Sequence, residues 1–273
     1  MEIIDGRKIA QSIIERLKSQ PKPQKTLAAI LVGNDPASIS FLKQKQRIAD
    51  ELGVKFEIRR LNEAITESDL IKEIKNIGES KDISGMIVQL PLPENLNREN
   101  ILNAIPKEKD IDVLSDKAKK DSRGGKSLVL PPAVAVIEEI FKSYFLNLKS
   151  LKVAVVGLGF LVGKPISEWL KNKCAELYLL DIGDDLNTIK NADWVISGVG
   201  RAGLIKPEML KNDAIIIDFG YDTKDGKISG DLDVSNLKSY DLNLKPGYYT
   251  PTPGGTGPIL VAELFKNFYK LNS

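Results

Sequence analysis

The stretch Val153-Ala-Val-Val-Gly-Leu-Gly-Phe-Leu-Val-Gly163, with Asp181 at the end of the next apolar run, decides the fold. A buried strand, a glycine turn, a helix, a second strand and an acidic residue follow in the order of a dinucleotide-binding βαβ unit. Gly157 permits the tight turn, and Gly159 lets the backbone approach a pyrophosphate at the start of the helix. Gly163 comes one residue later than in the usual Gly-x-Gly-x-x-Gly pattern. The segment predicts a nicotinamide or flavin cofactor, with the Asp181 carboxylate accepting a hydrogen bond from a ribose hydroxyl.

The composition limits the class of protein. A chain of 273 residues is long enough for two domains of ordinary size, which is the better expectation for a cofactor enzyme. Its 39 basic and 37 acidic residues leave a formal charge of +2, so nucleic acid is not an expected partner. The sequence contains no apolar run of about 18 residues, and its start lacks the pattern of a signal peptide. We therefore expect a cytoplasmic protein without membrane contact.

Histidine is absent, and cysteine occurs once, at Cys174. Without imidazole, a Ser-His-Asp triad and a histidine-based zinc site are excluded. One cysteine cannot form an intrachain disulfide or a cysteine metal cluster, so no metal site is expected. Proton transfer must rest on lysine, aspartate, glutamate, tyrosine or water.

Strand and helix signals alternate along the chain. Apolar runs separated by helices predict a parallel sheet covered on both faces. The last helix is expected to pack back on the first domain. The predicted strands are Thr26–Val32, Val54–Leu61, Gly85–Leu90, Val153–Val156, Ala175–Leu180, Trp194–Ser197 and Ala214–Asp218, and the predicted helices are Gly6–Ser19, the segment opened by Asp35 and ended by Gly53, Glu67–Ile77, Pro132–Phe145 and Ile259–Leu271.

Two segments of the first half carry side chains suited to chemistry. Phe41 and Lys45 lie four residues apart on one helix face, where an aromatic plane beside an ammonium could hold a flat heterocycle and deliver a proton. The alternative is a solvated helix face. Gln89 and Leu90 lie at the carboxyl end of a strand, where open α/β sheets collect ligands. The prolines that follow also explain these positions as a simple strand end.

Two further segments are less regular. Asp110 and Asp112 can be interpreted as helix caps or linker charges, and with the polar stretch Lys117–Lys126 they mark the expected crossing between domains. The turn cluster Pro251–Pro258 holds three glycines and three prolines. Such a fixed loop with few side chains suits close backbone approach to a ligand.

Taken together, these segments resemble the bifunctional methylenetetrahydrofolate dehydrogenase/methenyltetrahydrofolate cyclohydrolase family over nearly the whole chain. Eight motifs match in order. They are Asp5-Gly6, Gly33-Asn-Asp-Pro-Ala-Ser38 with Lys45, Val88-Gln-Leu-Pro-Leu-Pro93, Lys109-Asp-Ile-Asp112, the nucleotide loop ending in Val162-Gly-Lys-Pro165, Ile217-Asp-Phe-Gly220, Gly230-Asp-Leu-Asp233 and Thr250-Pro-Thr-Pro-Gly-Gly-Thr-Gly-Pro258.

The resemblance implies a hydride transfer from 5,10-methylenetetrahydrofolate to a nicotinamide cofactor, followed by hydrolysis to 10-formyltetrahydrofolate, in one-carbon metabolism. It implies that Lys45 is the central catalytic residue in proton transfer and water activation, that Gln89 hydrogen-bonds and tunes Lys45, and that Asp112 holds the pterin ring. The implied substrate contacts are Ser38, Phe41, Leu90, Pro253, Gly254 and Gly255. The expected cofactor contacts are Gly157, Leu158, Gly159, Val162, Gly163, Asp181, Gly198, Val199, Gly200 and Thr256.

The resemblance also implies an organisation in two α/β domains with a cleft between them. The first, an open parallel-rich sheet domain that binds folate, is expected over residues 1–118 with the C-terminal helix 257–273. The second, a Rossmann-type NAD(P)-binding domain, is expected over residues 119–256. The family is typically a homodimer that associates through its nucleotide domains, so a homodimer is expected here.

Four departures from the family pattern are visible. Phe41 replaces the usual tyrosine, which keeps the ring but removes its hydroxyl. Pro131-Pro-Ala-Val134 replaces the usual Pro-Cys-Thr-Pro. Leu158-Gly159 replaces an Arg-Ser pair whose arginine helps to hold the extra phosphate of NADP, and Asp181-Ile182 replaces a His-Ser pair. Because leucine cannot bind a phosphate and a carboxylate repels one, the sequence predicts a preference for NAD over NADP.

Two alternatives stay open. One is a dehydrogenase that has lost the cyclohydrolase step through the change at Phe41, against which the retention of Lys45 and Gln89 argues. The other is a non-catalytic dinucleotide-sensing module, which leaves the intact lysine, glutamine and Asp112 unexplained.

Overall fold

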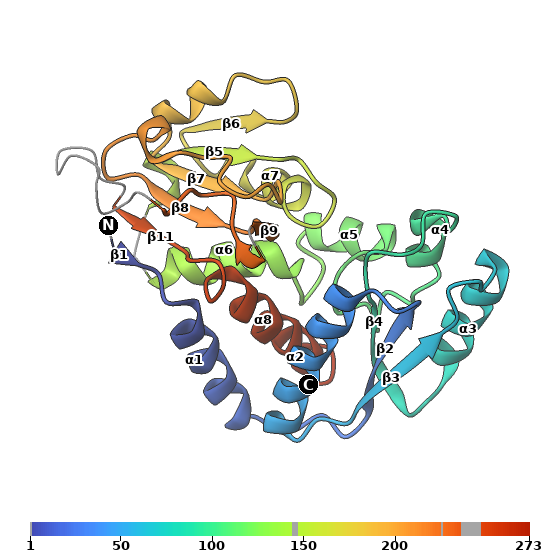
Figure 1. Ribbon diagram of the computed structural model, residues 1–273. Helices are drawn as coiled ribbons and strands as arrows, with labels where there is room; N and C mark the ends of the chain where they lie inside the picture. Colours follow the sequence, from blue (N-terminus) through green and yellow to red (C-terminus); the bar gives the residue numbers. More distant parts are fainter. Residues whose placement is uncertain (1, 144–146, 225, 236–246) are drawn as a thin grey trace. The chain divides into compact units, whose positions relative to one another are not determined.

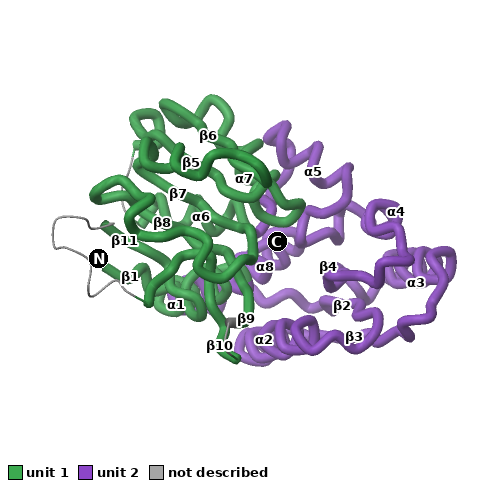
Figure 2. Tube along the Cα trace, turned by 45° about the horizontal axis from the view of Figure 1, so that its top comes forward, with its two compact units in different colours: residues 1–10, 133–260 green, residues 11–132, 261–273 purple. Residues whose placement is uncertain are grey.

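The structure is a computed structural model that describes residues 2–143, 147–224, 226–235 and 247–273. The chain forms two compact units, drawn in green and purple in Figure 2. Unit 1 comprises residues 1–10 and 133–260, and unit 2 comprises residues 11–132 and 261–273. Each unit is built on a parallel sheet, which confirms the predicted class of two α/β domains.

Unit 2 contains a three-stranded parallel sheet in the order β3-β2-β4. The central strand is almost wholly apolar and buried, as expected for a strand paired on both sides and covered on both faces. Gly85 brings α8 close to the sheet, because a Cβ added at this residue would lie 2.5 Å from the Phe268 ring. The strands are β2 (Thr26–Val32), β3 (Phe56–Leu61) and β4 (Ile83–Val88) (Figure 1).

Helices of unit 2 begin and end at residues that the sequence marks. Asp35 caps α2, since its carboxylate accepts a 2.7 Å hydrogen bond from the backbone N–H of Ser38, and Gly53 ends that helix at φ 63°. Thr66 caps α3 in the same way. The helices are α1 (Gly6–Lys18), shared with unit 1, α2 (Pro36–Leu52), α3 (Glu67–Glu79), α4 (Arg98–Asn103) and α5 (Asp116–Arg123).

Unit 1 contains a six-stranded sheet in the order β1-β11-β8-β7-β5-β6, with every adjacent pair parallel. Its strands are β1 (Glu2–Ile3), β5 (Lys152–Val156), β6 (Glu176–Leu180), β7 (Trp194–Ser197), β8 (Ile215–Asp218) and β11 (Tyr248–Tyr249). A separate hairpin pairs β9 (Asp222–Lys224) with β10 (Lys227–Ser229). The helices are α6 (Pro132–Ser143), α7 (Gly163–Leu170) and the first turn of α8 (Thr256–Lys270), which continues into unit 2. Short 3-10 turns lie at Leu148–Ser150, Leu186–Asn191 and Pro207–Met209.

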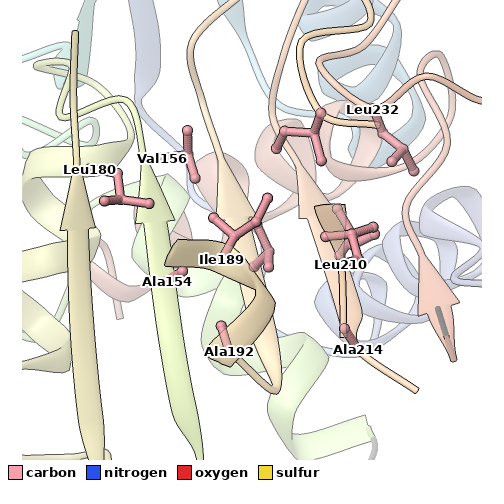
Figure 3. Close-up of a cluster of buried hydrophobic side chains, with 11 residues drawn as sticks. Ala154, Val156, Leu180, Ile189, Ala192, Leu210, Ala214 and Leu232 are labelled. Atoms are coloured by element: carbon pink, nitrogen blue, oxygen red, sulfur yellow. The ribbon is translucent and has the colours of Figure 1, made fainter. Parts of the chain in front are cut away.

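The predicted βαβ strands contribute side chains to the hydrophobic core of unit 1. Figure 3 shows Ala154 and Val156 of β5 beside Leu180 of β6, with Ile189 and Ala192 from the segment that follows. Apart from Leu180, which keeps 6% exposure, these side chains are almost fully buried. Burying an aliphatic side chain of this size contributes about 1.5–3 kcal/mol. The core therefore fixes the strand ends at which the glycine turn emerges.

The unit boundaries differ from the ranges that the sequence predicts. Residues 1–10 group with unit 1, because β1 extends its sheet beside β11. The polar stretch interpreted as a domain crossing is largely helix α5 within unit 2, where Lys107 and Asp121 form a 2.6 Å ion pair. The chain passes into unit 1 after Pro132 instead, and residues 261–273, which include most of the last helix, belong to unit 2.

Smaller differences concern element ends. Strand β4 stops at Val88, two residues earlier than predicted, and the last helix begins at Thr256 rather than Ile259. Helix α6 is described to Ser143, so the predicted end at Phe145 falls outside the described residues. Peptide bonds Leu90–Pro91 and Thr252–Pro253 are cis, which the sequence does not indicate.

Candidate active site

Lys45 and Gln89 meet at the carboxyl end of β4 in unit 2. The backbone N–H of Gln89 donates to the Ile30 carbonyl (2.9 Å), which holds the residue beside the central strand. Its side-chain Nε2 donates to the Leu90 carbonyl (2.7 Å), so Oε1 faces away and accepts a 2.9 Å hydrogen bond from Lys45 Nζ. Gln89 is only 7% exposed. A buried amide, fixed at both ends, therefore orients the lysine amine.

Helix α2 presents three of the predicted residues along one stripe. Ser38, Phe41 and Lys45 follow at spacings of three and four residues, which places them on the same helix face. Ser38 is buried, and its hydroxyl donates to the Leu90 carbonyl at 3.4 Å. Phe41 and Lys45 are half-buried. The helix thus brings an aromatic ring and an amine to the strand end where Gln89 and Leu90 lie.

The segment Lys109–Val113 is held by an unusual number of polar bonds. Lys109 Nζ donates to the carbonyls of Gly78 (2.6 Å) and Ser80 (2.7 Å), which caps the end of α3. The fully buried Asp110 carboxylate accepts from the backbone N–H groups of Leu114 (3.0 Å) and Ser115 (2.7 Å).

Val113, directly after Asp112, adopts φ 56° and is buried. A β-branched residue in the left-handed region costs about 1–3 kcal/mol and persists only where neighbouring contacts impose it. The bonds of Lys109 and Asp110 on the preceding residues supply such contacts. Asp112 therefore occupies a loop whose backbone is determined on both sides.

The charged groups of this cluster shift one another's proton affinity. Burial lowers the pKa of Lys45, and the negative charge of Asp112 partly opposes this shift. Burial raises the pKa of Asp112 to about 6, opposed by the Lys45 charge and assisted by that of Asp110. An amine that gives up its proton more readily than usual, beside an acid that titrates near neutrality, is equipped for acid–base chemistry.

In unit 1 the glycine turn follows β5 as the sequence predicts. Gly157 has φ 82°, and its N–H donates to the Leu180 carbonyl at 2.8 Å. A Cβ added at Gly163 would lie 1.8 Å from the Gly157 carbonyl oxygen, so the third glycine allows α7 to start directly against the turn. Helix α7 has no side-chain cap at Val162. Among its first residues, Lys164 donates its N–H to the Gly159 carbonyl (3.0 Å) and Pro165 has no N–H, which leaves the Gly163 N–H to meet an anion.

A second glycine segment lies beside this turn. A Cβ added at Gly198, after β7, would lie 2.7 Å from a Val162 side-chain carbon, and one added at Gly157 would lie 2.8 Å from a Val199 side-chain carbon. Around Gly159, by contrast, the nearest atom to an added Cβ is 4.0 Å away. The residues form a cradle that is tight between protein segments and open at Gly159, and this fits a bound pyrophosphate.

The remaining predicted cofactor residues lie on several elements of unit 1. Asp181 is exposed immediately after β6, the strand next to β5, and its backbone N–H donates to Asp184 (2.8 Å). Leu158 is half-buried in the turn, and Gly200 has φ 75°. The Thr256 hydroxyl donates to the Asp218 carbonyl at 2.8 Å, so it is engaged within the protein.

Pro253, Gly254 and Gly255 belong to unit 1, whereas Lys45, Gln89 and Asp112 belong to unit 2. Gly254 has φ 105°, which favours glycine. A Cβ added at Gly6 would lie 1.7 Å from the Gly255 carbonyl oxygen, so the start of α1 packs tightly on this loop. The Asp5-Gly6 motif is explained by this contact and by the Asp5 carboxylate, which accepts from the N–H of Arg7 (3.0 Å).

The structure joins Lys45, Gln89, Ser38 and Leu90 through hydrogen bonds and couples Asp112 to Lys45 by charge. Sequence reasoning missed the helix cap made by Lys109 and the turn held by Asp110. It also missed the hydrogen bonds of Asp218 and Asp231, two buried residues of unit 1. The motifs that contain them were the available signal. Within the described ranges, no group of three or more acidic or cysteine residues is placed to hold a metal, and no helix is long and apolar enough to cross a membrane.

Comparisons with known proteins give one consistent result. The model for "tetrahydrofolate dehydrogenase/cyclohydrolase, catalytic domain" matches residues 4–112, and that for the NAD(P)-binding domain of the same name matches residues 131–273. A "bifunctional protein FolD" from Nautilia profundicola is 36% identical over 99% of this chain and 96% of its own. One from Mycoplasma mobile is 38% identical over 99% and 97%.

Among solved structures, the bifunctional FolD methylenetetrahydrofolate dehydrogenase/cyclohydrolase of Campylobacter jejuni superposes with a TM-score of 0.92. It is 30% identical, and the match covers 100% of this chain and 98% of that one. The expected homodimer stays a prediction.

Proposed function

We propose that this chain, which belongs to the tetrahydrofolate dehydrogenase/cyclohydrolase family, oxidises 5,10-methylenetetrahydrofolate and hydrolyses the 5,10-methenyl product to 10-formyltetrahydrofolate. It is a bifunctional enzyme of that family with an NAD(P)-binding domain. The observation that carries the residue assignments is the 2.9 Å hydrogen bond from Lys45 Nζ to the buried Gln89 amide, in a cluster where burial lowers the pKa of the lysine.

The dinucleotide, when bound, supplies the hydride acceptor. The glycine turn at Gly157 and the Gly163 N–H at the start of α7 would hold its phosphates, and the open space at Gly159 would admit them. The carboxylate of Asp181, exposed at the end of β6, would accept from a ribose hydroxyl. Hydride removal from the methylene carbon releases no proton. In this step the protein therefore positions the substrate against the dinucleotide and supplies no base.

The hydrolytic step does require a base. Water adds to the methenyl carbon, a C–N bond of the bridge breaks, and one proton is released as the 10-formyl group forms. Lys45 in its neutral form takes the proton from the attacking water, and burial favours that form. The Gln89 Oε1 atom accepts from the amine in both protonation states, so it keeps the lone pair aimed.

Asp112 and Phe41 are assigned to the pterin. The carboxylate of Asp112 accepts from ring N–H groups, and the Phe41 ring offers an apolar face to a flat heterocycle. Both side chains are half-buried, which leaves part of each available to a ligand. Because Phe41 lacks the tyrosine hydroxyl, Gln89 is the group among these that orients Lys45 by a hydrogen bond. This bond favours an enzyme with cyclohydrolase activity over a dehydrogenase that has lost it.

The preference of the dehydrogenase for NAD tests the cofactor assignment. With methylenetetrahydrofolate as the substrate, we expect kcat/KM to be at least about tenfold higher for NAD than for NADP, because Asp181 repels a 2′-phosphate. Replacing Asp181 by serine is expected to raise kcat/KM for NADP. Glu176→Gln, at the other end of β6, is the matched control and leaves the ratio unchanged. A native preference for NADP contradicts the assignment, and absence of hydride transfer to either cofactor contradicts the proposed function.

The pH dependence of folate binding tests the role of Asp112. As the pH falls through about 6, Asp112 gains a proton and loses its charge. The KM for methylenetetrahydrofolate should then rise by up to about tenfold per pH unit, since only the ionised form accepts from the pterin. Steady-state rates, measured between pH 5 and 8 at roughly two pH values per pH unit, give the KM at each pH. In Asp112→Asn the KM is expected to be higher and flat across this range, and a wild-type KM without an inflection near 6 is inconsistent with the assignment.

A further inference from the structure

Two buried aspartates in unit 1 take no part in the chemistry described above. Asp218 ends β8 and Asp231 follows the β9–β10 hairpin, within the motifs Ile217-Asp-Phe-Gly220 and Gly230-Asp-Leu-Asp233. Their exposed fractions are 2% and 0%. Buried carboxylates are retained only where several donors satisfy their oxygens. The donors identify what each carboxylate holds.

Asp231 binds the loop that follows β7 through three donors. Its Oδ2 accepts from the Ser197 hydroxyl (2.6 Å) and the Val199 N–H (2.8 Å), and its Oδ1 accepts from the Arg201 N–H (2.7 Å). These donors alternate along five residues of chain, so one side chain holds the segment Ser197–Arg201 at three points. The Asp231 carboxylate thus accepts loop hydrogen bonds that, in a strand, a neighbouring strand would accept.

The carboxylate itself has little freedom to move. The Asp231 carbonyl accepts from the Ile205 N–H at 2.8 Å, which anchors its backbone. On the other side, a Cβ added at Gly220 would lie 2.4 Å from its Oδ1, so that glycine makes room for the carboxylate. Because the Asp231 carboxylate is itself fixed, it can hold the loop in a fixed position.

The loop held by Asp231 lies against the nucleotide turn. A Cβ added at Gly198 would lie 2.7 Å from Val162, and one added at Gly157 would lie 2.8 Å from Val199. Gly200 has φ 75°, and Val199 is 39% exposed. The Gly198 N–H donates to the Val156 carbonyl (3.0 Å), and beyond that residue the loop is held by the bonds of Val199 and Arg201 to Asp231.

We propose that Asp231 is a positioning residue for the dinucleotide: it sets the Gly198–Arg201 loop against the glycine turn in the conformation that binds the cofactor. The inference rests on the proposed function, because it takes the glycine turn as the dinucleotide site. It assigns a role to the Gly230–Asp233 motif and explains why glycine stands at position 220.

Asp218 supports this arrangement from the neighbouring strand. Its Oδ2 accepts from the Leu232 N–H (2.9 Å), directly after Asp231, and its Oδ1 accepts from the Gly220 N–H (2.7 Å). Burial raises the pKa of Asp218 to about 7, and the nearby charge of Asp231 acts in the same direction. Asp218 thus holds both the backbone directly after Asp231 and Gly220, the glycine that makes room for the Asp231 carboxylate.

The test replaces Asp231 by asparagine in the full-length protein. An amide has one acceptor oxygen, so its NH2 group must face a donor of the loop. We expect the Kd for NAD, measured by isothermal titration calorimetry, and the KM for NAD to rise by at least about tenfold. The KM for methylenetetrahydrofolate and the rate of methenyltetrahydrofolate hydrolysis, which is assigned to Lys45 and Gln89 and needs no dinucleotide, should stay within about twofold.

Two further variants keep the result interpretable. Asp193→Asn is the matched control, because this carboxylate also accepts a backbone N–H, that of Lys152 (2.8 Å), but directly precedes β7. It should leave the Kd for NAD unchanged. If Asp231→Asn does not fold, Ser197→Ala removes one of the three donors and should weaken NAD binding by about two- to fivefold with hydrolysis intact.

An unchanged Kd for NAD in the folded Asp231→Asn protein overturns the proposal, and so does an equal fall of both activities. For Ser197→Ala, an unchanged Kd for NAD does the same. Failure of the wild-type protein to bind NAD or transfer hydride is a different outcome, because it removes the proposed function itself.

Discussion

Replacing Lys45 by methionine is expected to lower the rate of methenyltetrahydrofolate hydrolysis by at least about 10²-fold, the range in which loss of a general base falls. Methionine keeps most of the length and apolar stem of lysine but has no amine to accept the proton of the attacking water. It also leaves the Gln89 Oε1 atom without the donor that it has at 2.9 Å. The hydrolysis of purified methenyltetrahydrofolate, followed by its loss of absorbance and corrected for the uncatalysed rate, measures the effect.

The dehydrogenase step should respond much less, because hydride transfer releases no proton. In the same Lys45→Met protein we expect NADH formation to fall by no more than about tenfold, so that methenyltetrahydrofolate accumulates. Lys43→Met is the matched control: Lys43 lies on the same helix and is exposed, and its loss should leave both rates unchanged. A hydrolysis rate in Lys45→Met equal to that of the wild type would remove Lys45 from the mechanism.

Replacing Gly163 by alanine is expected to disable the dinucleotide site. The added Cβ would lie 1.8 Å from the Gly157 carbonyl oxygen, a backbone atom that can move only if the turn or the start of α7 shifts. Such overpacking lowers the free energy of unfolding by about 1–3 kcal/mol. The displaced turn should also raise the Kd for NAD by at least about tenfold. Thermal unfolding followed by circular dichroism and calorimetric titration with NAD measure the two effects.

Gly159→Ala separates the two causes. The nearest protein atom to its added Cβ is 4.0 Å away, so the melting temperature should equal that of the wild type. If the open space belongs to the pyrophosphate, NAD binding weakens even though stability does not change. Tight NAD binding by Gly163→Ala would contradict the position assigned to the turn, and unaltered binding by Gly159→Ala would contradict the assignment of the open space.

The parts of the fold that sequence predicts well are those set by local pattern. Strand β2 is predicted to the residue, because an uninterrupted apolar run has one interpretation in a parallel sheet. The turn at Gly157 and the strands on both sides of α7 are likewise recovered. By contrast, β1 and β11 are two residues long and exist only because β1 pairs with β11 and β11 pairs with β8. No local pattern of that length predicts a strand.

The same contrast applies to the candidate site. The shared face of Phe41 and Lys45 follows from helical spacing, and the position of Gln89 follows from the strand end. That Lys45 meets Gln89, 44 residues later, depends on packing between elements. The shift of the pKa of Asp112 to about 6 comes from burial and the charges of Lys45 and Asp110, none of which composition can give. Asp231 was visible only as part of a motif, since its three donors lie 30 to 34 residues away.

If this one chain catalyses both reactions, a single reaction mixture must contain the products of both. Wild-type protein is supplied with 5,10-methylenetetrahydrofolate and NAD, and NADH, methenyltetrahydrofolate and 10-formyltetrahydrofolate are quantified over time. We expect 10-formyltetrahydrofolate to form in step with NADH, faster than methenyltetrahydrofolate hydrolyses without enzyme, while the concentration of methenyltetrahydrofolate stays low. Methenyltetrahydrofolate that accumulates in equal amount with NADH and decays only at the uncatalysed rate would contradict it.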